Sequence, residues 1–423
     1  MKILVVGGGG REHALAWKLA GDSTHPEIFC APGNAGTAEI ATNLAIAAED
    51  IPALSAWATE ARPDLTVVGP EAPLCAGLAD TLAAEGLLVF GPTAAAARLE
   101  GSKNFAKEVM QAAGVPTAEA HGFTNVDEAM AYLQERGAPI VVKAEGLAAG
   151  KGVTVCETIE QAEQAVREAM VEHAFGDAGN RVLIEECLTG EEASILALVD
   201  GETVVMLASS QDHKRALNDD AGPNTGGMGA YSPAPVITDD FWPVIREQVF
   251  DRTLAELKRR KIVFRGVLYA GLMIDQSVPK VLEFNCRFGD PETQAILPRL
   301  DADLSTALAA CARGELSEDM ISWRPEPCVC VVMASGGYPG AYEKGKSIAG
   351  LQEANEVEDA VVFHAGTKEQ EGQVVTSGGR VLGVTALGPD LKQAVNRAYA
   401  AVSKISFEGS QYRTDIAHRA FNR

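Results

Sequence analysis

The sequence predicts a multidomain α/β protein whose N-terminal part is a doubly wound parallel sheet. Two observations lead to this fold class. The chain has 423 residues, which is too long for one hydrophobic core and corresponds to roughly two to four domains. Its first hundred residues alternate short apolar runs with helical stretches, as in a parallel sheet covered by helices. The hydrophobic share of 47% is ordinary for a folded protein with a large core.

Composition excludes several classes of function. The formal net charge of −22 disfavours nucleic-acid binding, which needs a basic surface. No apolar run approaches the roughly 20 residues of a membrane span, and glycines interrupt the N-terminal apolar run where a signal peptide would continue. The eight cysteines are scattered without a C-x-x-C pair, which is typical of reduced core residues. We therefore expect a soluble, cytoplasmic protein with no nucleic-acid or membrane partner.

The N-terminal region, residues 1–101, is expected to place functional residues at the carboxyl ends of its strands. The expected strands are 3–6, 27–30, 65–68 and 87–90, with a helix at 12–20. The strand ends carry Gly7 to Gly10 with Arg11, then Asn34, then Glu71. The dinucleotide fingerprint G-x-G-x-x-G fails, because its third glycine position is Glu12 or His13. Glycines before a helix still suit a phosphate, with a plain tight turn as the alternative.

Residues 102–190 contain a strand, a glycine-rich loop and a second strand that suit phosphate binding. The strands are expected at 140–143, 153–156 and 182–186, with helices at 127–135 and 158–172. The loop E-G-L-A-A-G-K-G at 145–152 is not a Walker A motif, because Gly152 stands where a hydroxyl residue is needed. Lys143 lies within a strand, and buried lysines are rare without a partner. A phosphate site is therefore favoured over a structural turn.

The segment 191–326 is expected to combine further strands with a long polar loop. Strands are predicted at 193–199, 203–209, 267–275 and 280–285, and a helix at 239–260. The polar, glycine-rich loop at 222–233 follows Asp212, Lys214 and Arg215. Long loops inside compact domains are usually functional or disordered, and the neighbouring charges favour function.

Glu283, Asn285 and Arg287 follow one another at a spacing of two residues near the end of an apolar run. On a strand, residues at this spacing share one face. A carboxylate and a carboxamide oxygen suit Mg²⁺, which takes one or two protein ligands, and the arginine suits an anion. Taken alone, the motif is equally compatible with the polar face of a half-exposed strand. From about residue 327 we expect a small α+β domain, in which we recognise no catalytic constellation.

The ordered set of motifs along the whole chain resembles the phosphoribosylamine–glycine ligase family, which has the ATP-grasp fold. The most specific motifs are V-V-G-G-G-G-R-E-H-A, V-V-K-A-E-G-L-A-A-G-K-G-V, S-Q-D-H-K-R, G-P-N-T-G-G-M-G-A-Y-S-P and L-E-F-N-C-R-F-G-D-P-E-T-Q. The resemblance implies an N-terminal substrate-binding domain at 1–101, an ATP-grasp domain of two subdomains at 102–326 with a mobile lid at about 121–190, and a C-terminal domain at 327–423. It also implies ligation of glycine to 5-phospho-β-D-ribosylamine with ATP and Mg²⁺ or Mn²⁺, in a monomer or weak dimer.

By the same resemblance, each candidate residue has an expected role. The ATP site would comprise Lys103, Lys143, Gly150, Lys151, Gly152, Glu185, Glu186, Leu188 and Glu191. The metal ligands would be Glu283 and Asn285. The catalytic residues would be Arg287, Lys214 and Asp212. The substrates would contact Gly9, Gly10, Arg11, Asn34, Glu71, Arg215, Asn224, Gly226 and Gly227.

One departure from several ATP-grasp ligases is the absence of a carboxylate between Val267 and Ile274, where a second metal ligand is common. Two other functions compete with this interpretation. Another ATP-grasp carboxylate–amine ligase would share the ATP site and differ in the substrate loops. A nucleotide-binding sensor that does not turn over ATP is disfavoured, because Lys143, Glu283, Asn285 and Arg287 are all present.

Overall fold

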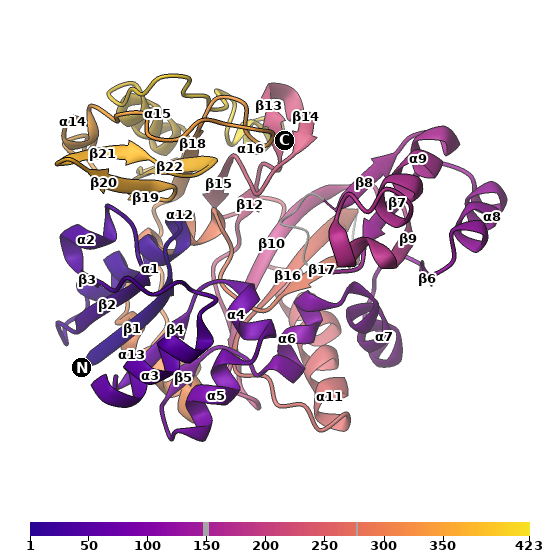
Figure 1. Cartoon of the computed structure of the whole chain (residues 1–423), viewed down its shortest axis with the longest axis horizontal. Coiled ribbons are helices and arrows are strands. Elements are labelled where there is room, and N and C mark those ends of the chain that lie inside the picture. The colour runs from indigo at the N-terminus through magenta and orange to yellow at the C-terminus, as the bar shows by residue number, and fades with distance from the viewer. Residues whose placement is uncertain (147–151, 276–277) are drawn as a thin grey trace.

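The N-terminal region forms the expected doubly wound sheet (Figure 1). The structure is a computed structural model that describes residues 1–146, 152–275 and 278–423. Five parallel strands follow the order β3-β2-β1-β4-β5. They are β1 (Lys2–Gly7), β2 (Glu27–Pro32), β3 (Thr42–Asn43), β4 (Leu65–Val68) and β5 (Val89–Phe90). The four predicted strands are confirmed, although β5 is shorter than the predicted run.

Helices cover both faces of this sheet. Successive side chains of β1 therefore enter different cores. Leu4 shares a core with α3 (Ile51–Ala61), whereas its neighbour Ile3 shares another with α1 (Gly10–Ala20). A strand that is buried on both faces needs a continuous apolar sequence, as found here. The carboxyl end of β1, between β2 and β4, is consequently a crevice in which residues of both neighbouring turns meet.

A separate antiparallel sheet of the order β6-β9-β7-β8 corresponds to the predicted lid (Figure 1). Its strands are β6 (Ala120–Phe123), β7 (Ile140–Ala144), β8 (Val153–Cys156) and β9 (Val182–Glu186). Helices α8 (Val126–Arg136) and α9 (Ile159–Met170) pack on it around a core of its own. The glycine-rich loop joins β7 to β8, and its Gly150 and Lys151 lie outside the described residues.

The central sheet has the order β11-β10-β16-β17 and is antiparallel throughout. Its strands are β10 (Glu191–Val199), β11 (Val204–Met206), β16 (Gly266–Asp275) and β17 (Val278–Asn285). A bulge at Gly271 and Leu272 shifts the register, so that Gly271 pairs with Glu283. The predicted helix at 239–260 comprises α10 (Phe241–Ile245), a π-helical stretch (Arg246–Asp251) and α11 (Arg252–Arg259).

The C-terminal sheet has the order β12-β15-β18-β22-β19 and recruits two strands from the segment 211–233, which includes the predicted loop 222–233. These are β12 (Gln211–Asp212) and β15 (Gly229–Ser232), which join β18 (Cys328–Ala334), β22 (Arg380–Leu387) and β19 (Ala360–His364). The segment 211–233 also contains the hairpin β13 (Arg215–Leu217) and β14 (Ala221–Asn224). Interpreting 222–233 as a loop was therefore wrong. Its backbone groups find their partners in β18, far along the chain, which a glycine-rich composition does not reveal.

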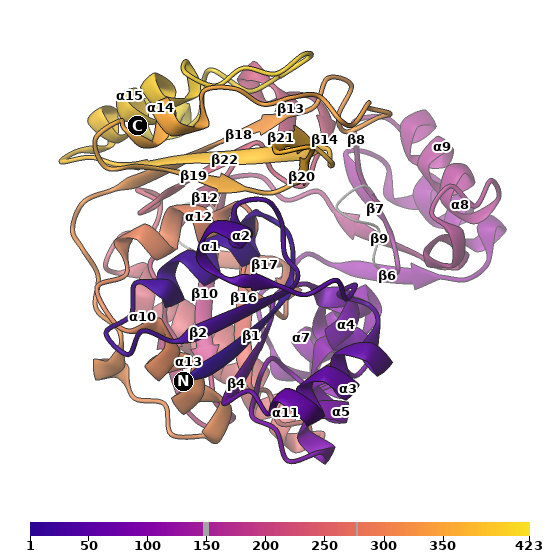
Figure 2. The same cartoon turned by 60° about the vertical axis from the view of Figure 1, so that its left-hand side comes forward.

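Helices connect these sheets, and Figure 2 shows α1 and α12 lying beneath the C-terminal sheet. The remaining helices are α2 (Thr37–Ile40), α4 (Glu71–Cys75), α5 (Leu78–Ala84), α6 (Ala94–Gly101), α7 (Lys103–Ala113), α12 (Glu292–Ile296), α13 (Leu304–Arg313), α14 (Leu351–Asn355), α15 (Leu391–Val402) and α16 (His418–Phe421). A further hairpin comprises β20 (Thr367–Gln370) and β21 (Gln373–Thr376). Within the described part of the chain, no helix has the length and apolarity to span a membrane. The predicted domain boundaries stay a prediction.

Candidate active site

A cavity of about 880 Å³ lies where the N-terminal sheet, the lid, the central sheet and the C-terminal sheet meet. Its size is within the usual range for sites that bind small molecules. Most of the predicted site residues line it: Arg11, Glu71, Lys103, Lys143, Gly152, Glu185, Glu186, Leu188, Asp212, Lys214, Arg215, Asn224, Gly226, Glu283, Asn285 and Arg287. Gly9, Gly10, Asn34, Glu191 and Gly227 are not among its lining residues.

Two lysines and one glutamate form a buried ion cluster at the lid end of the cavity. Glu185 on β9 contacts Lys143 on β7 at 2.7 Å and Lys107 on α7 at 3.2 Å. All three side chains are almost completely buried. Burial is the main influence on Lys107 and lowers its pKa to about 8, although the Glu185 charge opposes the shift. Lys107 was not among the predicted site residues, although its spacing of four residues from Lys103 places both on one face of α7.

Lys103 begins α7 and reaches the start of the glycine-rich loop. Its Nζ donates to the carbonyl of Gly146 at 3.0 Å. The adjacent Glu145 accepts the backbone N–H of Asn104 at 3.1 Å and the hydroxyl of Ser102 at 2.5 Å. Burial lowers the pKa of Lys103, and the Glu283 carboxylate opposes that shift. The helix and the first residues of the loop are thus fastened together, with the ammonium group of Lys103 facing the cavity.

Glu283 and Asn285 present oxygen atoms to the cavity from β17. Burial alone would raise the pKa of Glu283, but the charges of Lys214, Lys143 and other cations lower it below its ordinary value. Its carboxylate makes no hydrogen bond to another described residue. An ionised carboxylate beside a carboxamide oxygen forms a donor set of the hard type that Mg²⁺ and Mn²⁺ prefer. The two residues present therefore fit a divalent cation.

Arg287 lies two residues beyond the end of β17. The strand periodicity therefore does not determine where its side chain points. Four acceptors hold its guanidinium group: Glu100 at 2.9 Å, and Glu71, Asn285 Oδ1 and the carbonyl of Phe288, each at 3.3 Å. Burial would lower its pKa, but the Glu100 and Glu71 carboxylates raise it, which keeps the group cationic. Glu100 was not among the predicted site residues, since it lies on the neighbouring helix α6.

Asp212 and Lys214 line another wall of the cavity, together with the carboxylates of Glu192 and Glu292. Lys214 Nζ lies 2.6 Å from Glu192 Oε2. Burial raises the pKa of Asp212 to about 7, with Lys214 opposing the shift and nearby carboxylates adding to it. Glu292, which was not predicted, is one of these carboxylates and accepts hydrogen bonds from Tyr269 at 2.7 Å and Ser194 at 3.2 Å. The sequence feature that could have pointed to Glu292 is the P-E-T-Q motif that contains it.

The N-terminal glycine turn is organised around Glu12. Glu12 Oε2 accepts the N–H of Gly9 at 2.6 Å, and Oε1 accepts from Arg11 Nε at 2.5 Å. A Cβ atom on Gly7 or Gly69 would approach the Glu12 side chain to within 2.5 Å, so these glycines make room for it. Gly9 and Gly10 therefore build the turn from which Arg11 faces the cavity.

Asn34 and Glu191 are bound to other parts of the protein. The Asn34 amide donates to the carbonyls of Gly8 at 3.0 Å and His364 at 2.7 Å, and its oxygen accepts the N–H of Gly36 at 2.9 Å. Its side chain therefore braces the turn between two domains. Glu191 lies 2.7 Å from Arg423, at the end of the chain. Neither residue offers its side chain to the cavity.

The C-terminal domain contributes Tyr338, Tyr342, Arg380 and Arg419 to the cavity, which the sequence did not indicate. Arg380 Nη1 donates to the carbonyl of Asp290 at 2.8 Å and also to that of Gly226. The hydroxyl of Tyr338 accepts the N–H of Gly226 at 3.0 Å. The glycine-rich stretch that contains Gly227 is thereby attached to the C-terminal domain, and Gly227 itself has the left-handed φ of +109°.

Comparisons with known proteins agree with this architecture. Family models match in three consecutive parts: the phosphoribosylglycinamide synthetase N domain at 1–100, the ATP-grasp (A) domain at 101–293 and the C domain at 328–419. The phosphoribosylamine–glycine ligase of Escherichia coli O157:H7 is 55% identical and aligns over 100% of this chain and 99% of its own length.

Solved structures give the same result for the fold. The phosphoribosylamine–glycine ligase of Thermotoga maritima has a TM-score of 0.87 and 35% identity, covering 99% of this chain and 100% of that one. A biotin carboxylase of Campylobacter jejuni has a TM-score of 0.74 at 15% identity, covering 97% and 92%, and shares the fold alone. The expected ATP-grasp architecture with N-terminal and C-terminal domains is confirmed.

Proposed function

Because the chain belongs to the phosphoribosylglycinamide synthetase family, we propose that it joins glycine to 5-phospho-β-D-ribosylamine, using ATP. The products are glycinamide ribonucleotide, ADP and phosphate, as in de novo purine biosynthesis. The proposal rests on the full-length identity of 55% to the phosphoribosylamine–glycine ligase of Escherichia coli O157:H7. The cavity supports it, since phosphate-binding cations, a pair of metal-binding oxygens and a charged substrate wall converge there.

The chemistry explains why ATP is needed. A carboxylate is a poor electrophile at neutral pH, so the γ-phosphoryl group is first transferred to a glycine carboxylate oxygen. The ribosylamine nitrogen then attacks the carbonyl carbon of glycyl phosphate, the C–O bond to phosphate breaks, and the nitrogen loses a proton. Catalysis of such steps depends on positioning and on neutralising charge, with no side-chain nucleophile. Arg287, held by Glu71 and Glu100, is suited to the negative charge of the acyl phosphate.

Lys103 and Lys143 are proposed to bind the phosphates of ATP beneath the glycine-rich loop. The ammonium group of Lys143 donates to Glu185 and to the carbonyl of Leu282 at 3.2 Å, which leaves one of its three donors for a phosphate. The Glu185 side chain is occupied by the two lysines, so any contact of this residue with adenine would use its backbone. Adenine would lie between the apolar lining residues Met110, Val141, Val155, Met273 and Leu282, next to Glu186 and Leu188.

Glu283 and Asn285 are proposed to hold Mg²⁺ or Mn²⁺. When bound, the ion would neutralise phosphate charge and orient the transferred group. The preceding strand β16 contributes Tyr269 and Met273, and no carboxylate, to the lining of the cavity. The protein therefore supplies ligands for one ion more readily than for two.

The substrates are proposed to bind between the N-terminal turn and the wall formed by 212–226. Arg11 would contact the phosphate of ribosylamine, with Gly9, Gly10 and Asn34 acting through the turn that they build. Asp212 and Lys214 would face glycine and the reacting amine, beside Arg215, Asn224 and Gly226. We leave Glu191 out of the ATP site, because its carboxylate pairs with Arg423.

The decisive experiment measures ADP formation with glycine and freshly formed phosphoribosylamine. We expect strict dependence on both substrates, and alanine or serine should support little turnover. Dependence on a different carboxylate or amine would favour another ATP-grasp ligase. ATP binding without turnover would favour a nucleotide sensor, and either result would overturn the proposal.

The cellular setting is also a proposal. The eight cysteines are unpaired, six of them buried, as expected in a reducing compartment. We propose that the enzyme works in the cytoplasm as a monomer or weak dimer, on small molecules alone. Size-exclusion chromatography with light scattering would reveal a higher oligomer and so contradict the last point.

A further inference from the structure

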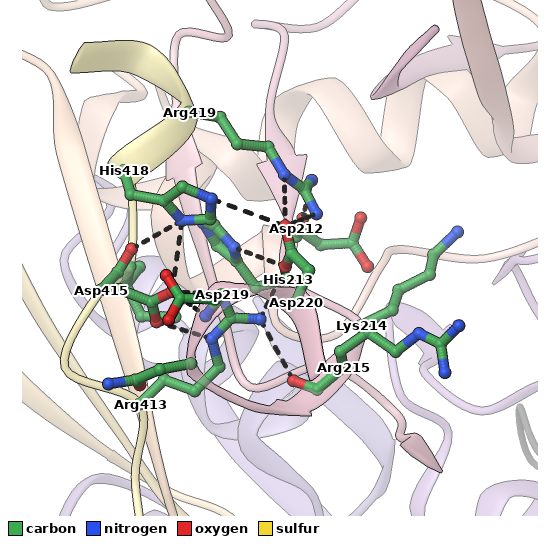
Figure 3. Close-up of polar contacts among 12 residues, drawn as sticks. Asp212, His213, Lys214, Arg215, Asp219, Asp220, Arg413, Asp415, His418 and Arg419 are labelled. Atoms are coloured by element: carbon green, nitrogen blue, oxygen red, sulfur yellow. Dashed lines mark hydrogen bonds and ion pairs between the residues drawn. The ribbon is translucent and has the colours of Figure 1, made fainter. Parts of the chain in front are cut away.

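A partly buried charge cluster joins the C-terminal segment to the wall of the cavity (Figure 3). Both oxygens of Asp220 accept from guanidinium groups, Oδ1 from Arg413 at 2.8 Å and Oδ2 from Arg419 at 2.8 Å. Arg413 also forms a bidentate pair with Asp415, at 2.8 and 2.7 Å, and its side chain is completely buried. Charge-assisted and bidentate bonds of this kind are the strongest hydrogen bonds in proteins.

The cluster contains three side chains with metal-binding atoms, His213, Asp220 and His418. Its other contacts argue against a metal ion. Two guanidinium groups already occupy the Asp220 carboxylate and would repel a cation. Nε2 of His213 accepts the N–H of Ala417 at 3.0 Å, which removes the imidazole lone pair. We interpret the cluster as a joint between two chain segments.

The joint contacts three residues of the segment 212–215, which are Asp212, His213 and Arg215. Arg419 Nη1 donates to the carbonyl of Asp212 at 3.2 Å. The N–H of Ala417 donates to the ring of His213, and Arg413 Nη1 donates to the carbonyl of Arg215 at 3.2 Å. The C-terminal segment therefore runs along 212–215 and holds it at both ends. These partners are separated by about two hundred residues in the sequence.

The side chains of 212–215 point to two sides. Asp212, Lys214 and Arg215 line the cavity, whereas His213 is fully buried and lies in the cluster. Figure 3 shows Lys214 directed away from His213 and from the arginines. Arg413 and His213 of the joint thus lie behind the wall that carries the proposed substrate residues, whereas Asp220 and Arg419 lie at its edge and also line the cavity.

We propose that Arg413 and Arg419 are positioning residues, which fix the backbone of 212–215 so that Asp212 and Lys214 face the substrates. This inference rests on the proposed function. The C-terminal domain would then complete the substrate side of the cavity from behind. The planar guanidinium fork holds two acceptors in fixed geometry, which a lysine ammonium group does not.

Arg419 provides the test, because its side chain is 24% exposed and its loss endangers the fold less than loss of the fully buried Arg413. For Arg419→Gln we expect the KM for glycine to rise roughly 10- to 100-fold, since misplacing a catalytic group by about 1 Å can cost that much. The KM for ATP should change less than about 2-fold, because the lysines that bind phosphate are untouched. Hydrogen exchange of backbone amides in 211–224 should become faster. Arg419→Lys should recover part of the loss.

The matched control is Arg397→Gln. Arg397 also pairs with two carboxylates of the C-terminal domain, Glu358 at 2.6 Å and Asp359 at 2.7 Å, but does not line the cavity. It should leave both KM values and the exchange of 211–224 unchanged. An unchanged glycine KM in Arg419→Gln would overturn the inference, whether or not exchange increased, and so would an equal rise in the KM for ATP. Failure of the proposed function would instead appear in the unaltered enzyme, as turnover that does not require glycine.

Discussion

The two ends of the cavity are built in different ways. The ATP end uses side chains on neighbouring strands and one helix, and leaves several polar groups available: among the described residues Lys103 donates to a single carbonyl, and the Glu283 carboxylate bonds to none of them. At the substrate end two of the cations are already paired with carboxylates, Lys214 with Glu192 and Arg11 with Glu12.

This difference suggests two strategies for binding charge. Groups with few protein partners can gain most of the benefit of phosphate and metal contacts, because few protein bonds are lost when ATP binds. Paired groups are held in position beforehand, and binding costs them less conformational entropy. We therefore expect changes at the ATP end to abolish the reaction altogether, and changes on the substrate wall to alter the use of one substrate.

The largest effect is expected for Glu283→Gln. A neutral amide removes the charge proposed to hold the metal ion, so Mg²⁺-dependent ADP release should fall by about 10³-fold. Asn285→Ala should act in the same direction. Both variants should keep the melting temperature of the unaltered enzyme to within a few degrees. Glu202→Gln, an exposed surface change near Lys258, is the control. Near-normal turnover in either variant would contradict the metal assignment.

A smaller and more selective effect is expected for Arg11→Ala. Loss of a charge-assisted contact should raise the KM for phosphoribosylamine by roughly 10- to 100-fold, and leave the KM values for ATP and glycine nearly unchanged. Initial rates at varied phosphoribosylamine test this. Arg62→Ala, which removes an arginine from the outside of the same domain, should have no effect. An unchanged KM for phosphoribosylamine would refute the role of the turn.

The use of glycine should also depend on pH, through Asp212 on the substrate wall. Burial raises the pKa of Asp212 to about 7, so its carboxyl group is largely neutral below that pH and ionised above it. If the ionised form faces the substrates, kcat/KM for glycine should rise by about tenfold per pH unit up to about pH 7 and then level off. In Asp212→Asn this inflection should disappear, and an identical pH profile in both proteins would exclude Asp212 as its source.

The smallest effect concerns stability at the ATP end. Burial lowers the pKa of Lys107 from 10.5 to about 8, so between these values the unfolded chain binds more protons than the folded protein. The Lys107 contribution to the free energy of unfolding should therefore rise with pH from about 8 to 10.5 and be constant below 8. Denaturant unfolding of Lys107→Met should lack this rise. Parallel curves for both proteins over this range would contradict the burial of a titrating lysine.

Local sequence patterns predicted most of the ATP end. Lys143, Glu283 and Asn285 lie on short strands, where a spacing of two residues sets the face of a side chain. Lys107 and Glu100 were missed because their roles arise from contacts across elements, with Glu185 and with Arg287. The composition of 222–233 was misleading, since glycine-rich strands resemble loops until a partner strand is known.

The sequence by itself determined the parallel N-terminal sheet, the strand–loop–strand unit of the lid and the spacing of the proposed metal ligands. Each of these depends on apolar periodicity or on neighbours a few residues away. Only the tertiary structure decided which side chains enter the cavity and which brace its walls. Arg380 and Arg419 reach it from the C-terminal domain, while Asn34 turns away to His364. Such contacts join residues that are hundreds of positions apart, and their geometry is settled by the packing of the three domains.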